Sequence, residues 1–327
     1  RHPKILKKIK FVVMDELHFL DNNFRGDQLR ILLKRIAKIS DNTNELNYYA
    51  MSATINEPSE MCERYFENYE IIISKGSRKI VFATIDADNN FNELKKIKKI
   101  FMDQKINRAI FFCNSRKKTI KITAKLKEIF GRDDRIFEHH SSISSEVRKH
   151  VEKEMAREDN ILSFCVATAS LEIGIDIGNI QAVVLIEPPL TVSSLLQRIG
   201  RGNRRTNKTK CFGVFEIPED KKVFSEMIDD ARNGLIEDIK YESDISVAVQ
   251  QILSLTFQKY NEEKGKLTRE IVHDYLDVLV EDPEHIDLII EKIISDGYIE
   301  ESKGKITLTS KLLDFDDKFG TRGKINS

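Results

Sequence analysis

The chain has 327 residues, a length that suggests two domains and permits a third, and its 40% hydrophobic content excludes wholesale disorder. No apolar run approaches the roughly 20 residues that a membrane span needs, and the first residues lack the hydrophobic stretch of a signal peptide. Basic and acidic residues both number 53, but 19 acidic and only 7 basic residues fall within 229–301, so the rest of the chain is basic and could bind a polyanion.

The first elements predict a strand, a helix and a second strand. Apolar runs at Lys10–Met14 and Tyr48–Met51 read as strands, and apolar residues recur at near-helical spacing over Leu29–Ile39 between them. Each strand is followed by a polar motif, Asp15-Glu16 after the first and Ser52-Ala53-Thr54 after the second. Open α/β sheets place their ligands at that carboxyl-terminal edge of the strands.

The middle of the chain repeats this alternation and predicts a mostly parallel sheet. Four further β-rich runs cover residues 108–113, 136–138, 162–167 and 182–186. Helical stretches alternate with them: one from a cap at Asn114-Ser115 to about Phe130, one at Ser145–Ala156 and one at Ser193–Ile199. We therefore expect one complete α/β domain at residues 77–218, preceded by the end of another, with an incomplete sheet, at residues 1–76.

The acidic C-terminal region has a different pattern. Three amphipathic segments at residues 247–258, 268–279 and 283–296 precede two alternating runs joined around Lys303-Gly304. Three helices followed by a hairpin are typical of a winged helix. We expect this domain at residues 240–310, with a linker at residues 219–239 and a tail at residues 311–327.

Four cysteines are widely separated, with no Cys-x-x-Cys pair and no histidine cluster beside them: Cys62, Cys113, Cys165 and Cys211. This spacing disfavours a structural zinc site and a disulfide scaffold, and it fits a reducing cytoplasm. We expect a cytoplasmic protein without a membrane partner.

Four motifs carry possible chemistry. The carboxylates of Asp15 and Glu16 at a strand end suit a nucleotide-bound Mg²⁺, one holding the hydrated ion and the other orienting a water. The Ser52-Ala53-Thr54 triplet follows the neighbouring strand, and Ala167–Gly178 follows another. The stretch Gln197–Arg204 places two arginines three residues apart, where their guanidinium groups can stabilise charge on a transferred phosphoryl group. Each motif taken alone has an ordinary explanation, as a turn or a solvated helix end.

In combination and in this order, the motifs resemble motifs II, III, V and VI of the superfamily 2 helicases of the DEAD/DEAH-box kind. The detail is closest to the Lhr-type (large helicase-related) branch, because of the stretch His139–Arg148, the run Ser170–Gly178 and the Arg25-Gly26 pair. The resemblance covers about residues 10–215, and the C-terminal region matches less specifically. It implies an α/β fold with a partial first and a complete second RecA-like domain, plus a winged helix.

The resemblance also implies roles for individual residues. Asp15 would coordinate Mg²⁺ through water, and Glu16 would be the catalytic base for ATP hydrolysis. Arg201 and Arg204 would be arginine fingers. The other nucleotide-site residues would be Gly174 and Asp176, which face the nucleotide, and Gln197, which links the arginine motif to the Asp-Glu pair. Those that couple the nucleotide to nucleic acid would be His18, Ser52 and Thr54.

One DNA or RNA strand would be gripped through its phosphates. The residues implied are Asn114, Ser115 and Arg116 at a helix start, where a helix N-terminus favours an anion, and Thr168. One position departs from the family pattern, because Asn203 stands where a glycine is common. This leaves Arg205 as an alternative to Arg204.

None of the 14 glycines in the sequence belongs to a phosphate-binding loop of the form Gly-x-x-x-x-Gly-Lys-[Ser/Thr]. Gly265, Gly304 and Gly323 each precede a lysine, but Leu or Ile follows it. We therefore expect a fragment that begins midway through the first RecA-like domain and does not hydrolyse ATP by itself.

Two helical segments differ as candidate nucleic-acid surfaces. Residues 283–296, the third helix of the expected winged helix, carry four carboxylates and one lysine, which favours a structural or docking role over DNA reading. The basic stretch Arg116–Lys127 suits phosphates better, although its outer lysines also fit a solvated face.

The leading interpretation is part of an ATP-dependent DNA or RNA helicase that uses ATP and Mg²⁺. A non-catalytic nucleic-acid-binding adaptor with a decayed motor is the first alternative. A phosphohydrolase that handles no nucleic acid is the second, and the motifs at residues 140–204 fit it poorly.

Overall fold

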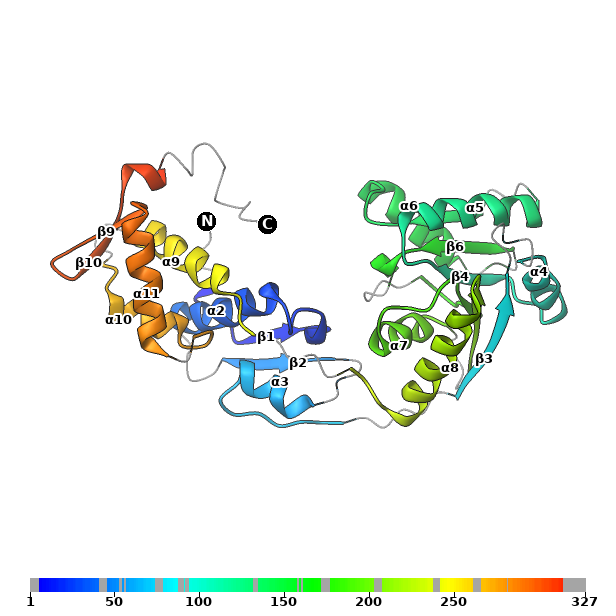
Figure 1. Cartoon of the computed structure of the whole chain (residues 1–327), viewed down its shortest axis with the longest axis horizontal. Coiled ribbons are helices and arrows are strands. Elements are labelled where there is room, and N and C mark those ends of the chain that lie inside the picture. Colours follow the sequence, from blue (N-terminus) through cyan, green and yellow to red (C-terminus); the bar gives the residue numbers. More distant parts are fainter. Residues whose placement is uncertain are drawn as a thin grey trace. The chain divides into compact units, whose positions relative to one another are not determined.

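The structure is a computed structural model whose elements form two compact units (Figure 1). Unit 1 comprises residues 1–52, 57–71 and 239–327, and unit 2 comprises residues 53–56 and 72–238. No helix in the described part of the chain is long and apolar enough to cross a membrane. The described residues are 6–40, 46–52, 55, 57–73, 79–87, 91, 94–131, 135–157, 159, 161–171, 177–202, 208–237, 242–260, 266–280 and 282–313.

Unit 2 is built on a six-stranded parallel sheet with the strand order β3-β8-β7-β4-β6-β5. Its strands are β3 (Lys79–Asp86), β4 (Arg108–Phe112), β5 (Ile136–His139), β6 (Ser163–Ala167), β7 (Ala182–Leu185) and β8 (Lys208–Phe215). Every residue of β4, β6 and β7 is buried, as expected for central parallel strands whose two faces are both covered. The expected α/β parallel sheet is thereby confirmed, and β3 and β8 add two strands that the sequence reading did not assign.

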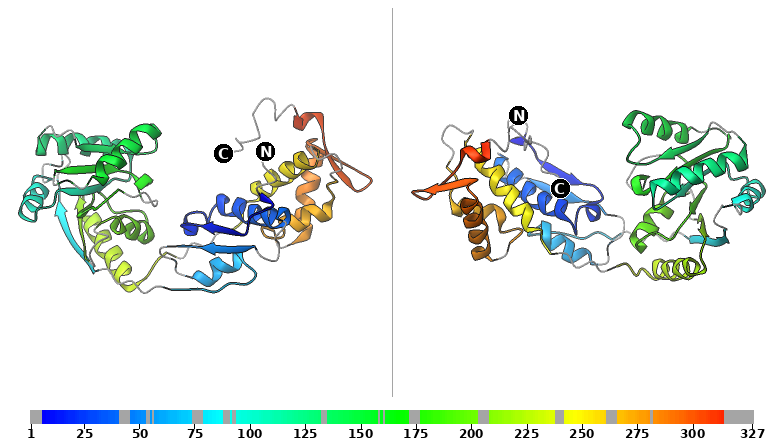
Figure 2. Two further views of the ribbon diagram at one scale, coloured as in Figure 1. Left: turned by 180° about the vertical axis from the view of Figure 1, so that it is seen from behind. Right: turned by 45° about the horizontal axis from the view of Figure 1, so that its top comes forward.

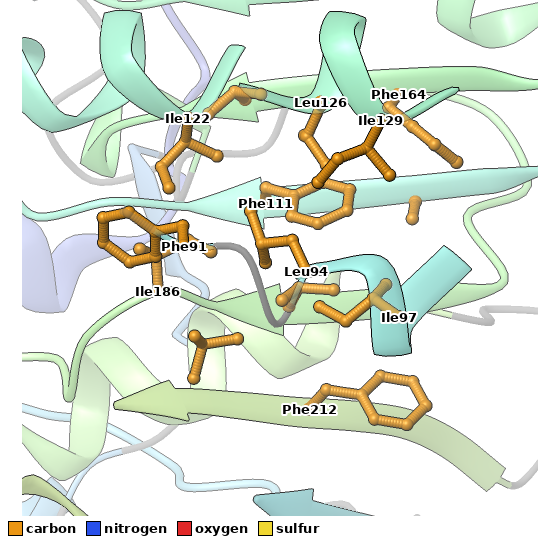
Figure 3. Close-up of a cluster of buried hydrophobic side chains, with 14 of the residues drawn as sticks. Phe91, Leu94, Ile97, Phe111, Ile122, Leu126, Ile129, Phe164, Ile186 and Phe212 are labelled. Carbon is orange, nitrogen blue, oxygen red and sulfur yellow. The ribbon is translucent and has the colours of Figure 1, made fainter. Parts of the chain in front are cut away.

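Helices cover both faces of this sheet. Helices α4 (Leu94–Asp103) and α5 (Arg116–Phe130) pack on one face, in a core that includes Phe111 and Phe164 (Figure 3). The other face packs against α6 (Ser145–Ala156), α7 (Val192–Gly200) and α8 (Pro218–Asn233), and the 3-10 helix η3 (Ala169–Leu171) lies on that side. Unit 2 is therefore a three-layer sandwich of helices, sheet and helices.

Helix α8 corrects the expectation of a linker at residues 219–239. Its residues Phe224, Met227 and Ile228 are buried in the core on the α7 side of the sheet, and Phe224 packs 5.6 Å from the ring of Phe82. The spacing of these three residues is helical, but the many charged residues around them made the segment resemble a linker. The domain therefore extends past residue 218 to the end of α8, where Gly234 adopts a left-handed conformation with φ 73°.

The N-terminal part of unit 1 contains two parallel strands, β1 (Phe11–Met14) and β2 (Asn47–Ala50), as the sequence predicted. The 3-10 helix η1 (Leu17–Phe19) and helix α2 (Phe24–Ile39) connect them, and α3 (Pro58–Tyr65) follows β2. Asn23 caps α2, because its side chain accepts a hydrogen bond from the backbone N–H of Arg25.

The C-terminal part of unit 1 contains the three expected helices and the expected hairpin. They are α9 (Ile245–Tyr260), α10 (Arg269–Leu276), α11 (Pro283–Ser295), β9 (Ile299–Ser302) and β10 (Lys305–Leu308). The hairpin turns at Lys303 and Gly304, which both have positive φ. Leu312 is only 1% exposed and belongs to the hydrophobic core that these helices and strands form. The segment expected to be a tail at residues 311–327 therefore begins inside the folded region.

Helix α2 packs directly against the C-terminal helices, which the sequence reading had placed in a separate domain (Figure 2). Ile31 of α2 is fully buried in the same cluster as Ile252 and Leu276. The carboxylate of Asp27 accepts a hydrogen bond from the backbone N–H of Asp244 at 2.8 Å. The two terminal regions of the chain thus form one compact unit around α2.

Candidate functional site

The Asp-Glu pair lies where β1 ends. Met14, the last residue of β1, is buried, whereas Asp15 is exposed immediately after it. Glu16 has φ 52° and ψ 46°, a left-handed conformation that is uncommon outside glycine, and it begins η1. This sharp turn buries Leu17 and keeps both carboxylates at the carboxyl edge of the sheet.

The end of β2 meets this turn through backbone and side-chain hydrogen bonds. The N–H of Met51 donates to the carbonyl of Met14 at 2.8 Å, and the N–H of Leu17 donates to the carbonyl of Met51 at 3.0 Å. Ser52 Oγ lies 2.7 Å from His18 Nδ1, and a carboxylate oxygen of Glu16 lies 3.5 Å from the same nitrogen. The structure therefore brings Glu16, His18 and Ser52 together, while Thr54 lies outside the described residues.

The environment of His18 favours its neutral form. Burial lowers the pKa of His18 below its ordinary value, and the nearby carboxylates of Glu16 and Asp15 oppose this effect only in part. Because His18 follows β1 and is hydrogen-bonded to Ser52 after β2, a movement at the end of one strand can displace the end of the other.

Asp15 offers a single carboxylate to a cation. Among the described residues, no group of three or more histidine, cysteine, aspartate or glutamate side chains could hold a metal ion. Mg²⁺ usually keeps several waters and binds one or two carboxylates together with substrate phosphates. An exposed carboxylate at a strand end fits that mode of binding, and it does not fit an all-protein metal cage.

In unit 2, the start of α5 is held by internal contacts. Ser115 caps the helix by accepting a hydrogen bond from the N–H of Lys118, and Arg116 is exposed. The backbone N–H of Asn114 donates to a carboxylate oxygen of Glu187 at 3.0 Å, and its side-chain amide donates to the carbonyl of Pro188 at 2.7 Å. These donors of Asn114 are therefore already used, whereas Arg116 projects into solvent.

Arg198 is a buried residue that contacts the start of α5, and the sequence analysis assigned it no role. It lies on α7, its guanidinium donates to Asn114 Oδ1 at 2.9 Å, and its Cζ lies 5.4 Å from the ring centroid of Phe112. It is 4% exposed. Its position three residues after buried Leu195 is the signal that could have placed it on the inner side of the helix.

Thr168 lies just after β6 and is partly buried. Its backbone N–H donates to the carbonyl of His139 at 3.2 Å, and Ser170 Oγ lies 3.0 Å from His139 Nδ1. Burial lowers the pKa of His139, although the Glu152 carboxylate hydrogen-bonded to it acts in the opposite direction. The ends of β5 and β6 are thus joined by a hydrogen-bonded cluster that fixes the backbone at Thr168.

The arginine motif is described only in part. Arg201 follows α7 and is 6% exposed, and Gln197 donates from Nε2 to Ser193 Oγ at 3.4 Å. Several residues singled out from the sequence lie outside the described residues: Gly174, Asp176, Asn203, Arg204 and Arg205.

Comparisons with known proteins agree with this arrangement of motifs. Residues 1–62 match the DEAD/DEAH box helicase family, and residues 92–206 match the helicase conserved C-terminal domain. The chain is 29% identical over 345 aligned positions to the ATP-dependent helicase Lhr-Core protein 2 of Thermococcus barophilus, covering 98% of this chain and 38% of that protein. It is 28% identical to the ATP-dependent helicase Lhr-Core of Methanocaldococcus jannaschii, with the same two coverages.

Solved structures with the same fold include the Mycobacterium smegmatis helicase Lhr bound to single-stranded DNA and AMP-PNP. That match has a TM-score of 0.77 at 20% identity and covers 94% of this chain and 42% of the other. The DUF1998 helicase MrfA bound to DNA matches with a TM-score of 0.70 at 20% identity, over 94% and 43% of the two chains. These matches support a RecA-like helicase fold.

Proposed function

We propose a function from the premise that the chain belongs to the Lhr-type superfamily 2 helicases of the DEAD/DEAH-box kind. The chain spans 38% of the length of the first two relatives, so the activity concerns the whole protein. We propose that this protein hydrolyses ATP and couples the hydrolysis to movement along a DNA or RNA strand. The observation that carries the proposal is the cluster of Glu16, His18 and Ser52 at the joined ends of β1 and β2.

In this proposal the Asp-Glu pair divides two tasks. Asp15 would hold a hydrated Mg²⁺, and that ion would neutralise charge on the phosphates of ATP. Glu16 accepts the proton of the attacking water, and its left-handed backbone holds the carboxylate beside His18.

The residues beside the Asp-Glu pair would couple the nucleotide-bound state of this site to the nucleic-acid site. His18 is hydrogen-bonded to Ser52 and lies within 3.5 Å of the Glu16 carboxylate, which supports a coupling role for His18 and Ser52. We propose the same role for Thr54. A displacement of Glu16 would therefore move the His18 ring, and the His18 ring would move the end of β2.

Unit 2 carries the other residues of the proposed nucleotide site. We propose that Arg201 and Arg204 stabilise negative charge on the transferred phosphoryl group, and that Gly174, Asp176 and Gln197 line the nucleotide site. Because Arg201 is 6% exposed, this role requires its guanidinium to become more accessible when nucleotide binds.

The same unit would grip one strand of nucleic acid. Arg116 is exposed at the start of α5, and Thr168 ends β6 with its backbone fixed by His139. We propose that Ser115, Arg116 and Thr168 contact backbone phosphates. The internal hydrogen bonds of Asn114 favour a positioning role for that residue, in which it orients the helix start.

We further propose that the C-terminal elements form a winged helix with a structural role. Arg269 binds the carboxylates of Asp287, Glu291 and Glu301, so part of the acidic face of α11 is compensated within the domain. The remaining acidic surface is poorly suited to DNA phosphates. All four cysteines are free thiols, which supports a reducing, cytoplasmic setting.

Replacement of the catalytic base tests the proposal. In the full protein, Glu16→Gln should lower nucleic-acid-stimulated ATP hydrolysis by about 100-fold or more, because the attacking water loses its proton acceptor. Binding of oligonucleotides should be retained. Glu60→Gln, an equivalent change at an exposed site on α3, is the control and should hydrolyse ATP normally.

Unchanged hydrolysis in the Glu16→Gln protein would contradict the proposed role. A full protein that binds oligonucleotides but hydrolyses no ATP would favour the adaptor interpretation. The polypeptide of residues 1–327 should show no ATP hydrolysis above background, because its sequence contains no phosphate-binding loop.

A further inference from the structure

The two helix layers of unit 2 differ sharply in charge. Helices α4 and α5, on one face of the sheet, carry ten lysine and arginine residues and two acidic residues. Helices α6, α7 and α8, on the other face, carry seven basic and eight acidic residues. Among the helices of unit 2, the excess positive charge therefore lies on one side of the sheet.

The cations of this layer are turned away from the protein core. Leu94 and Ile97 of α4 and Ile122 and Leu126 of α5 pack toward the sheet (Figure 3). The charged residues occupy the opposite sides of both helices. We define the α4–α5 basic face as the exposed residues Lys95, Lys96, Lys99, Arg116, Lys117, Lys121 and Lys127.

Other lysines of the two helices already have structural partners. Lys98 of α4 donates to the carbonyl of Ile129 at the end of α5, so it ties the two helices together. Lys118 binds Glu187 and Glu216, and Lys125 binds Glu128. In contrast, within the described part of the chain, no carboxylate forms an ion pair with Lys95, Lys96, Lys99, Arg116, Lys117 or Lys127.

The position of this face suits a long polyanion. Arg116, at the start of α5, belongs both to the face and to the proposed strand grip. From there α5 extends for 15 residues, about 22 Å, which matches several phosphates of a nucleic-acid strand. Six of the seven members are lysines and none is aromatic, a composition suited to phosphates and not to base stacking.

We propose that the α4–α5 basic face binds the phosphate backbone of nucleic acid beyond the segment held at Ser115 and Thr168. The inference rests on the proposed function and extends it, because it assigns the nucleic acid a second, sequence-independent contact surface on unit 2. Binding there would release counterions, so its contribution must weaken as salt rises.

The test compares two variants that lose the same charge. Lys95→Ala/Lys96→Ala/Lys99→Ala removes three cations from the basic face, and Lys221→Ala/Lys222→Ala/Arg232→Ala removes three exposed cations from α8 as the control. The full protein is titrated with single strands of about 8 and about 40 nucleotides at several salt concentrations, because the short one is close to the size of a single strand-binding site.

The basic-face variant should bind the long strand about tenfold more weakly at low salt, with a slope of log affinity against log salt that is smaller by about 2. Its binding of the short strand should equal that of the wild type, and the control variant should resemble the wild type with both strands. Equal binding of the long strand by both variants would overturn the proposal and leave the proposed function intact.

Failure of the nucleic-acid binding in the proposed function would look different, because the wild-type protein would then bind neither strand. A basic-face variant that binds the long strand normally but loses affinity for polyglutamate would also overturn the proposal, in favour of an acidic protein partner. Circular dichroism of both variants checks that the fold is unchanged, and the short-strand affinity provides an independent check of the strand grip.

Discussion

The imidazole of His18 joins two motifs that are separated by 34 residues in the chain. The Ser52 hydroxyl can donate to the ring nitrogen or accept from it, so this hydrogen bond is compatible with either protonation state of Nδ1. Because burial lowers the pKa of His18 below 6.5, the unfolded chain binds a proton more readily than the folded one. The folded state of unit 1 is therefore favoured as pH rises through the window between the lowered pKa and the ordinary one.

We expect His18→Gln to reduce the pH dependence of unit 1. Between about pH 5 and pH 7, the free energy of opening at the Leu17 and Met51 amides should rise more in the wild type than in the variant. Hydrogen exchange at these amides measures this free energy. The control is His285→Gln, which changes a histidine whose side chain is 67% exposed. The same rise in wild type and His18→Gln would show that His18 does not contribute.

The positions of the candidate site residues were predictable where these residues belong to local motifs. Asp15, Glu16, His18 and Ser52 follow strands whose apolar runs are visible in the sequence, and parallel pairing brings the strand ends together. Arg198 and Glu187 were missed because their roles depend on tertiary contacts with Asn114 across more than 70 residues of sequence.

Helix α2 is the element on which unit 1 depends. Asp27 is fully buried, its carboxylate pairs with Arg30, and Arg30 also donates to the carbonyl of Val278 at 2.9 Å. Lys34 pairs with Asp277 at a more exposed position. Removing one partner of the inner pair should therefore destabilise unit 1 much more than removing one partner of the outer pair, because an uncompensated buried charge is costly.

We expect Asp27→Ala to lower the free energy of unfolding of unit 1 by about 3–5 kcal/mol, because it leaves Arg30 buried without its carboxylate. Lys34→Ala should lower it by less than about 1 kcal/mol, since solvent and salt screen that pair. Denaturant unfolding followed by hydrogen exchange gives both values. Similar costs for the two substitutions would refute this account, and Asp27→Ala/Arg30→Met should recover part of the loss.

Element boundaries were predicted best where a local cap sets them. Ser115, Ser144 and Thr268 each accept a hydrogen bond from the helix that follows, and these helices start at or within one residue of the expected position. The packing of α2 on α9 and α10 could not be predicted from such local signals, because Ile31 and its partners are more than 200 residues apart in the sequence.

Unit 1 is assembled from both ends of the chain, and the intervening residues 72–238 belong to unit 2. The six-stranded sheet of unit 2 is covered on both faces by its own helices. The described residues among 1–71 form a two-stranded sheet, and such a sheet is marginal without further packing. The two units should therefore differ in their ability to fold alone.

We expect the polypeptide 72–238 to fold cooperatively when it is produced alone, and the polypeptide 1–71 to remain unfolded. The reason is that Ile31 and its neighbours lose the apolar surface of α9 and α10. Circular dichroism and thermal unfolding of the two polypeptides measure the difference. A cooperative transition in 1–71 would show that α2 and the strands are stable without the C-terminal region.

The split origin of unit 1 also matters during synthesis on the ribosome. After β1, α2 and β2 emerge, the residues that complete their packing follow only when the stretch 72–238 has been translated. At roughly 5–20 residues per second, this delay is on the order of 10–30 s. Throughout that interval the nascent segment displays Ile31 without the apolar residues of α9 and α10 that later cover it, so its yield in the cell should depend on chaperones that shield apolar polypeptide.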